Sequence, residues 1–455
     1  MLPVVLLLAA IAAPHQMSEW IPARWYSHDP ESLELVRQTP VNCLLLEQRD
    51  WSKPFVDRAA ADGIETLGVI RTSDAAVDAA HRAGALGMTG VVLEGDFPGD
   101  VAAAVEHSGI LNIRLSSRAS LDPNAPLVGT DQGVWPGVQI QKDGVTVSAP
   151  SGSPWIDTNA GFLRFIRTIA AGPVWIANAP PAGMAVTPAR YLQAIADAES
   201  AGAHWVVALD EDTSQRLLAG DAKALDLWLK TGALLGFYAG HPEWRAMRPH
   251  STLALIEDVS SGAYLAGGIM DMLAAKHTTV RPVALSSLRP ASIAGATLAV
   301  DVDPASLTST QQDELKAWTR AGNTLLNAPP GWKMPMPEDP KRIVLNSDQI
   351  ARLGEIWHET NSLIGNRNPG GRVYNAPGAI SNVVAGPSGH PVVVQLVNYT
   401  NYPLEDVTVR LTGVFSGAKL LVPGEAPRDL EIFEEDGSTE ITVPSVVVAA
   451  AVVME

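Results

Sequence analysis

The chain has 455 residues, 46% of them hydrophobic and 18% charged, and its 32 Lys and Arg against 49 Asp and Glu give a formal net charge of −17. A length of this order allows two to four domains, at about 100–200 residues each. The ordinary apolar fraction excludes a disordered chain, and the acidity argues against nucleic acid as a partner. A single cysteine, Cys43, excludes an intramolecular disulfide and a cysteine-cluster metal site.

An apolar stretch, LPVVLLLAAIAA, occupies residues 2–13 and has the length of the hydrophobic region of a signal peptide. It is too short to cross a bilayer, which needs about 20 residues. We therefore predict a signal peptide over residues 1–13, a secreted or periplasmic protein, and no membrane span once the leader is removed. The alternative is a wrongly assigned start or a buried N-terminal strand, because no Lys or Arg precedes the stretch.

Short apolar runs then alternate with helical patterns up to about residue 242. The eight runs begin at Pro22, Asn42, Thr66, Gly90, Ile110, Pro173, His204 and Ala233. Strands that alternate with helices imply βαβ units and a parallel sheet, and eight units in roughly 230 residues are what a (β/α)₈ barrel requires. We therefore predict an α/β fold with a TIM barrel over residues 20–248; a doubly wound sheet is the alternative.

One interval of this repeat is unusually long, from about Ile110 to Pro173. We interpret it as a long loop after the fifth strand, with a small hairpin around Lys142 and Gly144, before a helix that begins near Asp157. Long loops inside compact domains are usually functional. The interval is therefore expected to contribute to a binding site.

Two further domains are expected after the barrel. Residues 250–333 repeat a strand–helix pattern that predicts a small flavodoxin-like α/β domain, and the Pro-rich start of residues 334–383 indicates a linker and boundary segment. From residue 384 to 455, short β-rich runs separated by turns predict an antiparallel β-sandwich. Asn398, Tyr399 and Thr400 in this last part form a glycosylation sequon, a triplet that is common by chance.

Catalytic groups of such barrels lie at the C-terminal ends of the strands and in the loops that follow them. The side chains that this rule selects are Glu47, Arg71, Glu94, Asp96, Trp135, Trp155, Asp157, Asn159, Asn178, Asp210, Asp212, Tyr238 and His241. Carboxylates, Arg, Asn and aromatic rings in this combination suit a sugar, because rings stack on its apolar faces and charged groups bind its hydroxyls. We therefore predict an oligo- or polysaccharide as substrate.

Cleavage of a glycosidic bond needs two carboxyl groups, one protonated and one ionised. Glu94 and Asp210 follow the predicted fourth and seventh strands, on opposite sides of the barrel mouth, and form the first candidate pair. Asp157 is the next candidate partner, with Trp155 and Asn159 beside it to bind the sugar. The histidines form no metal-ligand motif, and no phosphate-binding loop follows a strand, so we predict no metal and no cofactor.

A barrel followed by a flavodoxin-like domain and a C-terminal β-sandwich resembles family 42 β-galactosidases and related exported glycoside hydrolases. The resemblance covers nearly the whole mature chain and rests on domain order. It implies an acid/base Glu that follows an Asn at the end of strand 4 and a nucleophilic Glu at the end of strand 7. In this sequence Leu93 precedes Glu94, and the seventh strand ends in Asp210, Glu211 and Asp212.

Each candidate also has a structural alternative. Glu94 could pair with Arg71 or Arg114 across the mouth, and Asp157 or Asp210 could cap the helix that follows it. Two other functions stay open: a non-catalytic carbohydrate-binding or cell-surface protein, and a barrel lyase or isomerase in which Arg side chains, among them Arg24, bind a uronic acid. Homo-oligomer formation is also left open.

Overall fold

The computed structural model describes residues 16–135, 138–142, 145–149, 158–257, 277–329, 332 and 347–455. Its N-terminal part is a parallel eight-stranded sheet in the order β1-β2-β3-β4-β5-β6-β9-β11. The strands are β1 (Pro22–Trp25), β2 (Cys43–Leu46), β3 (Glu65–Arg71), β4 (Gly90–Glu94), β5 (Leu111–Ser116), β6 (Val128–Thr130), β9 (Val174–Ile176) and β11 (His204–Trp205). The N–H of Arg24 donates to Val207 O at 2.7 Å, and the N–H of Val207 donates to Pro22 O at 3.0 Å. These bonds join the two edges of the sheet, which confirms the predicted TIM barrel.

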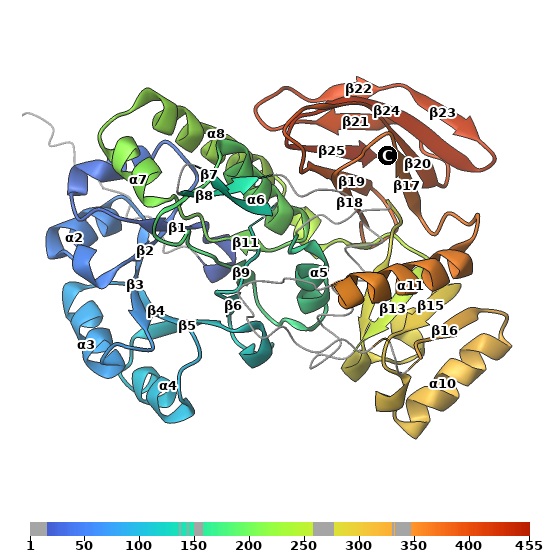
Figure 1. Cartoon of the computed structure of the whole chain (residues 1–455), viewed down its shortest axis with the longest axis horizontal. Helices are drawn as coiled ribbons and strands as arrows, with labels where there is room; N and C mark the ends of the chain where they lie inside the picture. The colour runs from blue at the N-terminus through green and yellow to red at the C-terminus, as the bar shows by residue number, and fades with distance from the viewer. Residues whose placement is uncertain are drawn as a thin grey trace, which may run out of the picture.

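Helices surround this sheet on the left of Figure 1. They are α1 (Leu33–Val36), α2 (Lys53–Ala61), α3 (Ala76–Leu86), α4 (Gly99–Glu106), α5 (Ala160–Ile169), α6 (Pro188–Ser200), α7 (Glu211–Leu218) and α8 (Ala222–Ala239). The strands read as continuous apolar runs because both of their faces are buried, one in the barrel and one under the helices. The cluster that fills the interior includes Cys43, Leu45, Val69 and Trp175, so Cys43 is a core residue.

The identity of two strands differs from the prediction. The apolar run from residue 233, expected as the eighth strand, is the second half of the 18-residue helix α8. The missing strand is β6, which lies in the interval interpreted as a loop and has only three residues. Gly129 lets β6 approach β5 closely, because a Cβ atom there would lie 2.6 Å from Arg114 O. The predicted hairpin is present, as β7 (Val138–Lys142) paired antiparallel with β8 (Val145–Ala149).

A second parallel sheet follows the barrel, in the order β14-β13-β15-β16. Its strands are β13 (Leu253–Glu257), β14 (Arg281–Ala284), β15 (Leu298–Asp301) and β16 (Thr324–Asn327), and α10 (Ser309–Arg320) connects the last two. This order matches the start of a doubly wound sheet. The helical pattern of residues 260–277 lies outside the described residues except for His277, so the flavodoxin-like domain as a whole stays a prediction.

The C-terminal part is a β-sandwich of two antiparallel sheets, one with six strands and one with four. The larger sheet holds β12 (Arg248–Pro249), β18 (Ala379–Ala385), β19 (Val392–Asn398), β25 (Ala449–Met454), β21 (Ala418–Leu421) and β22 (Arg428–Leu430); the smaller holds β17 (Gly371–Tyr374), β20 (Leu404–Thr412), β24 (Ser438–Val446) and β23 (Ile432–Glu435). One apolar cluster fills the space between the sheets. The segment 334–383, expected as a linker, contains α11 (Ser347–Ile364), β17 and the first five residues of β18.

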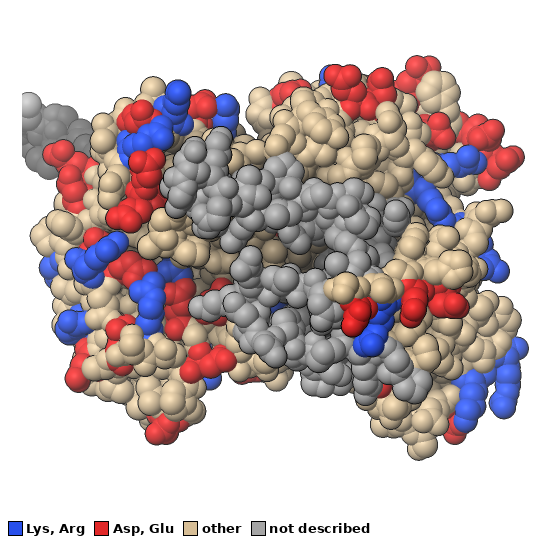
Figure 2. Space-filling model, viewed as in Figure 1, with Lys and Arg blue, Asp and Glu red and all other residues tan. Residues whose placement is uncertain are grey.

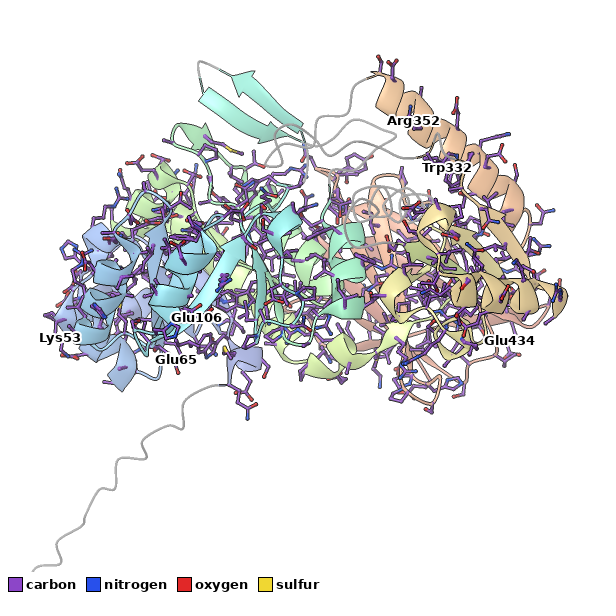
Figure 3. The ribbon with its side chains drawn as sticks, turned by 90° about the horizontal axis from the view of Figure 1, so that it is seen from below. Lys53, Glu65, Glu106, Trp332, Arg352 and Glu434 are labelled. Carbon is purple, nitrogen blue, oxygen red and sulfur yellow. The ribbon has the colours of Figure 1, made fainter. Side chains whose placement is uncertain are left out.

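The exposed faces show where the charge of the chain lies. Acidic and basic side chains alternate over the barrel, whereas acidic side chains gather along the sandwich edge that carries β22 and β23 (Figure 2). In the view from below, Lys53, Glu65 and Glu106 mark the barrel end, α11 with Arg352 lies at the other end, and the β7–β8 hairpin stands clear of the barrel (Figure 3). No helix in the described part of the chain is long and apolar enough to cross a membrane.

Candidate functional site

Four charged side chains form a layer at the C-terminal mouth of the barrel. Three belong to the strands β1, β3 and β4, and the fourth directly follows β2. Side chains two residues apart on a strand point to the same face. Glu47, Arg71 and Glu94 therefore continue the inward-facing rows that contain Leu45, Val69 and Val92 of the interior cluster. Arg24 is the register partner of Leu45 and faces inward with it. We call Arg24, Glu47, Arg71 and Glu94 the charged cluster.

Each carboxylate of the charged cluster contacts both guanidinium groups. Arg24 donates through Nη1 to Glu47 Oε1 at 3.1 Å and through Nη2 to Glu94 Oε1. Arg71 donates to Glu47 through both Nη atoms, with Nη2 to Oε1 at 2.8 Å, and its Nη2 lies 3.2 Å from Glu94 Oε2. Glu47 and Glu94 are thus linked to each other through both guanidinium groups.

The burial of these four groups is graded. The side chain of Arg24 is 1% exposed, those of Glu47 and Glu94 are each 14% exposed, and that of Arg71 is 46% exposed. Arg24 therefore forms the floor of the charged cluster, and Arg71 faces the solvent from which a ligand would arrive. Both carboxylates keep some contact with solvent, which a catalytic group requires.

The electrostatics of the charged cluster favour the ionised forms of Glu47 and Arg24. Burial raises the pKa of the Glu47 carboxyl, but the hydrogen bond from Arg71 and the charge of Arg24 outweigh that effect and hold this pKa below its usual value. Burial lowers the pKa of Arg24, but attraction to Glu94 and Glu47 outweighs it and raises this pKa. Burial also raises the pKa of the neighbouring Tyr26, so its hydroxyl stays protonated at neutral pH.

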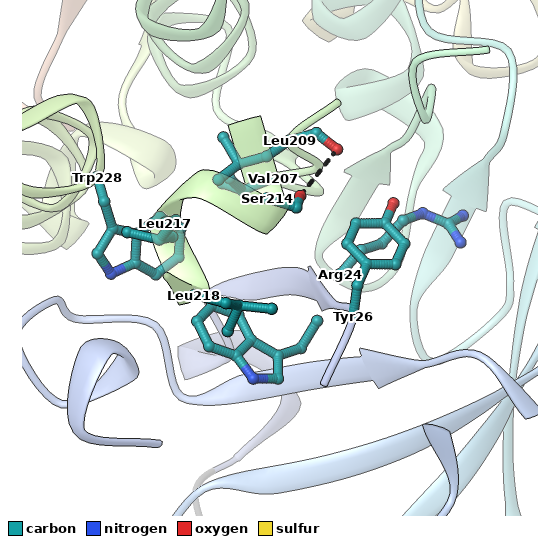
Figure 4. Close-up of a pocket in the computed structure, with 9 residues that line it drawn as sticks. Arg24, Tyr26, Val207, Leu209, Ser214, Leu217, Leu218 and Trp228 are labelled. Atoms are coloured by element: carbon teal, nitrogen blue, oxygen red, sulfur yellow. Dashed lines mark hydrogen bonds between the residues drawn. The ribbon is translucent and has the colours of Figure 1, made fainter. Parts of the chain in front are cut away.

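A small apolar hollow of about 10 Å³, room for about one water molecule, adjoins the charged cluster (Figure 4). It lies between β1 and the helices α7 and α8 and is lined by Arg24, Trp25, Tyr26, Val207, Leu209, Ser214, Leu217, Leu218 and Trp228. The guanidinium of Arg24 points away from Trp228 and Leu217, so only its aliphatic stem faces the hollow (Figure 4). Both indole N–H groups bond within the protein, Trp25 to Ser32 Oγ and Trp228 to Leu35 O. The hollow therefore offers mainly carbon surface.

Asp210, predicted as the partner of Glu94, has a structural role in the fold. It is 4% exposed and caps α7, accepting the N–H of Thr213 at 3.0 Å through Oδ1. Its Oδ2 accepts the hydroxyls of Tyr191 at 2.6 Å and Thr213 at 2.9 Å. The structural alternative for this residue, helix capping, is what the geometry shows, and its hydrogen bonds are directed to α6 and α7 and away from the charged cluster.

Asn159 and Trp135, predicted to bind substrate, are also buried. Asn159 is 0% exposed; its Oδ1 accepts from Arg118 Nη2 at 3.0 Å and Val134 N at 2.7 Å, and its Nδ2 donates to Asp197 Oδ2 at 2.9 Å. Trp135 is 3% exposed and packs edge-on against Tyr191 and Trp205. Neither side chain offers a free surface to a sugar.

The remaining predicted residues are spread over the barrel. Asp96 is exposed beside the mouth and accepts the N–H of Ser117 at 2.9 Å, and the half-buried Asn178 donates to Gly133 O at 2.6 Å. Asp212 lies in the first turn of α7 with its side chain 77% exposed. Asp157 and Trp155 lie outside the described residues.

Tyr238 and His241 were expected at the mouth, and this expectation is wrong. Both lie at the C-terminal end of α8, a helix whose apolar run predicted a strand. Helices of a (β/α)₈ barrel run antiparallel to the strands, so this end lies at the opposite face of the barrel. His241 stacks on Trp244 there, with ring centroids 4.2 Å apart.

The sequence prediction named Arg24 only in the uronic-acid alternative and not among the candidate site residues, whereas its pairing of Glu94 with Arg71 is confirmed at 3.2 Å. A signal existed, because an Arg within the apolar run PARW must find a charged partner if it is buried. Arg114, one expected partner of Glu94, instead pairs with Glu106 at 2.5 Å. In the part of the chain that the structure describes, no three His, Cys, Asp or Glu side chains converge as metal ligands.

Comparisons with known proteins place the fold but not a family. No family model matches this chain, and no curated protein matches its sequence. α-L-Fucosidase isoenzyme 2 from Paenibacillus thiaminolyticus is similar in structure, with a TM-score of 0.61 at 10% identity over 96% of this chain and 99% of the fucosidase. A rhamnosidase from Novosphingobium sp. PP1Y has a TM-score of 0.43 at 11% identity over 89% of this chain and 39% of the rhamnosidase, which is too low to support an argument. Neither is a family 42 β-galactosidase, so that resemblance is not confirmed. At these identities the fucosidase likeness establishes the fold alone.

Proposed function

We propose that the chain is an exported glycoside hydrolase that binds a carbohydrate at the charged cluster. The observation that carries this proposal is the pair of carboxylates, Glu47 and Glu94, held together at the C-terminal mouth of a barrel. That the full length resembles a protein named as an α-L-fucosidase supports a glycosidase in preference to other barrel enzymes. Export rests on residues 2–13 alone, and a mature N-terminus near residue 14 in the secreted protein would test it.

The roles within the mechanism follow from the pairing. A carboxylate that contacts two guanidinium groups is suited to stabilise positive charge on a sugar or to activate water, and unsuited to donate a proton. Glu47 and Glu94 both fit this description, so one of them is proposed as nucleophile or base and the other as the group that stabilises positive charge on the sugar. The proton for the departing oxygen must come from another group, for which Asp157 remains the candidate from the sequence. Water adds across the broken bond, so that two hydroxyl products form.

The other half of the mouth has a supporting role in this proposal. Asp210 and Asn159 are occupied by helix capping and by buried hydrogen bonds. The apolar hollow beside Arg24 has room for about one water molecule, so it contributes apolar wall to the mouth and no sugar subsite. A protonated Tyr26 lies between the hollow and the charges, where it could donate to a sugar hydroxyl.

A panel of aryl glycosides that starts with an α-L-fucoside tests the proposal. We expect turnover by the wild type, and a loss of about 100-fold or more in kcat/KM for Glu47→Gln and Glu94→Gln, the range for a group acting on the reacting centre. Glu106→Gln is the matched control, because Glu106 is exposed and pairs with Arg114 outside the charged cluster. Full activity of both test variants would overturn the site assignment.

A non-catalytic carbohydrate-binding protein is the second candidate. It is favoured by one observation: two Glu and two Arg neutralise each other, so the charged cluster is complete without a ligand. Binding of an oligosaccharide without turnover of any glycoside, weakened by Arg71→Gln, would support this candidate and reject the hydrolase.

A further inference from the structure

The barrel and the β-sandwich meet at a short turn that links β19 to β20, residues 398–401. Arg190 of α6 is 0% exposed and donates through both Nη atoms to Tyr399 O, each at 3.2 Å, and through Nη2 to Asn401 Oδ1 at 3.1 Å. Gln193, one turn further along α6, donates to Asn398 O at 2.9 Å and to Thr400 O at 3.0 Å. The helix thus binds three carbonyl groups of one turn.

The sequon residues hold the turn through buried hydrogen bonds. Asn398 is 0% exposed, and its Nδ2 donates to the carbonyls of Tyr402, Val446 and Val447 at 2.8–3.1 Å. Its Oδ1 accepts the N–H and hydroxyl of Thr400. The amide that a glycan would need is therefore occupied and buried. In this fold the triplet shapes an interface.

A series of hydrogen-bonded, buried side chains connects this turn to the barrel mouth. The hydroxyl of Tyr399 donates to Asp197 Oδ1, and Asp197 Oδ2 accepts the backbone N–H of Asn159 at 2.8 Å and its Nδ2 at 2.9 Å. Asn159 Oδ1 accepts Arg118 Nη2 at 3.0 Å and Val134 N at 2.7 Å.

This series of hydrogen bonds ends at Arg118, beside the barrel mouth. Arg118 follows β5, and its guanidinium lies 4.0 Å above the centroid of the Phe162 ring. Its Nε also donates to Gln132 O at 3.0 Å, so Arg118 has one fixed orientation beside the loops after β5 and β6. Tyr191, on the same helix α6, holds Asp210 at the end of the barrel sheet.

We propose that the 398–401 turn of the sandwich is a positioning element of the barrel mouth, and that Tyr399 acts through Asp197 and Asn159 on the position of Arg118. The sandwich then has a defined task in the full chain. The kinetic part of this inference rests on the proposed function, whereas its structural part does not.

Tyr399→Phe tests the inference, because it removes one hydroxyl and keeps the ring. We expect backbone hydrogen exchange at Val134 and Asn159 to become about fivefold faster, while exchange at Arg24, whose N–H donates to Val207 O in the other half of the barrel, stays the same. If glycoside turnover is found, KM should rise about threefold at unchanged kcat, since only binding geometry is disturbed.

Tyr402→Phe is the matched control, because Tyr402 is 58% exposed and contributes only backbone atoms to the hydrogen bonds of the turn. Unchanged exchange at Val134 and Asn159, or an equal increase at Arg24, would overturn the inference. A wild type without any turnover would reject the proposed function. The hydrogen-exchange result would still decide whether the 398–401 turn positions the mouth.

Discussion

The two halves of the barrel mouth use carboxylates in different ways. On the side of β1 to β4, Glu47 and Glu94 are partly exposed and pair with guanidinium groups. On the side of β11 and α6, Asp210 and Asp197 are buried and accept hydrogen bonds from neutral hydroxyls and amides. The carboxylates of the first half form ion pairs at the mouth, whereas those of the second half hold neighbouring parts of the fold in place through hydrogen bonds.

The cause of this difference lies in the segment after each strand. Glu94 is succeeded by Gly95 with φ +102° and by a loop, so the next helix, α4, begins only at Gly99. Asp210 is followed at once by α7, whose free N–H groups bind its carboxylate. Glu47 also directly precedes a short helix, Gln48–Asp50, but its side chain makes no cap hydrogen bond. A carboxylate at a strand end is thus available for chemistry only if the N–H groups of a following helix do not bind it.

The largest effect that would separate the two halves is expected from Arg24→Met. This change leaves Glu47 and Glu94 facing each other with only Arg71 to balance them, and removal of one partner from a buried charge pair typically costs about 3–5 kcal/mol. Urea unfolding would measure the loss in the free energy of unfolding. Arg114→Met is the control, because it breaks an exposed pair worth about 1 kcal/mol or less. Equal effects of the two variants would contradict the assigned role of Arg24.

The pH dependence of stability should have opposite signs in the two halves. The pKa of Glu47 is lowered in the folded state, so its contribution is present above pH 4.5 and is lost as the pH falls. Burial raises the pKa of Asp197, despite its four donors, so its contribution is lost as the pH rises above 3.8. Each unit of pKa shift corresponds to about 1.4 kcal/mol.

Urea unfolding of Glu47→Gln and Asp197→Asn between about pH 3.5 and about pH 7 would test these signs, because linkage ties the slope of stability against pH to the protons that each state binds. The stability advantage of the wild type over Glu47→Gln should grow as the pH rises, and its advantage over Asp197→Asn should shrink. Parallel curves for the two variants would show that the two halves do not differ in this way.

Trp135→Phe should have a smaller effect. The indole packs against Tyr191 and Trp205, and its buried Nε1 makes no hydrogen bond to the described residues, so the variant loses contact area without leaving a new unpaired donor. We expect a loss of about 1–2 kcal/mol in the free energy of unfolding. Affinity for a glycoside should be unchanged in a titration; a clear loss of affinity would restore the role in substrate binding that the sequence predicted.

Much of the barrel could be predicted from the sequence because seven of its apolar runs are real strands. The run from residue 233 failed because a buried helix and a buried strand both read as continuous apolar sequence, and only the length of α8 distinguishes them. The strand β6 was not predicted because three residues, Val128, Gly129 and Thr130, are too few to show an apolar run. One false strand was predicted and one true strand was missed, so the predicted number of eight strands was still correct.

The site could be predicted only in part. Glu47, Arg71 and Glu94 were found because the strand-end rule depends on one strand at a time. Asp210 and Asn159 satisfied the same rule, but their availability depends on partners such as Tyr191 and Asp197, which come from a helix that the rule does not consider. Burial by distant elements is a tertiary property and leaves no local pattern.

Asp210→Asn gives the smallest expected effect and the most direct comparison with Glu94→Gln. Asn is as good an N-cap as Asp, so α7 should keep its start, and only the hydrogen bonds that Oδ2 accepts from the hydroxyls of Tyr191 and Thr213 are weakened. We expect a loss of about 1 kcal/mol or less in the free energy of unfolding, with kcat/KM on any turned-over glycoside unchanged. If kcat/KM instead fell as far as in Glu94→Gln, Asp210 would be a catalytic group, and the division of the mouth into a charged half and a supporting half would be wrong.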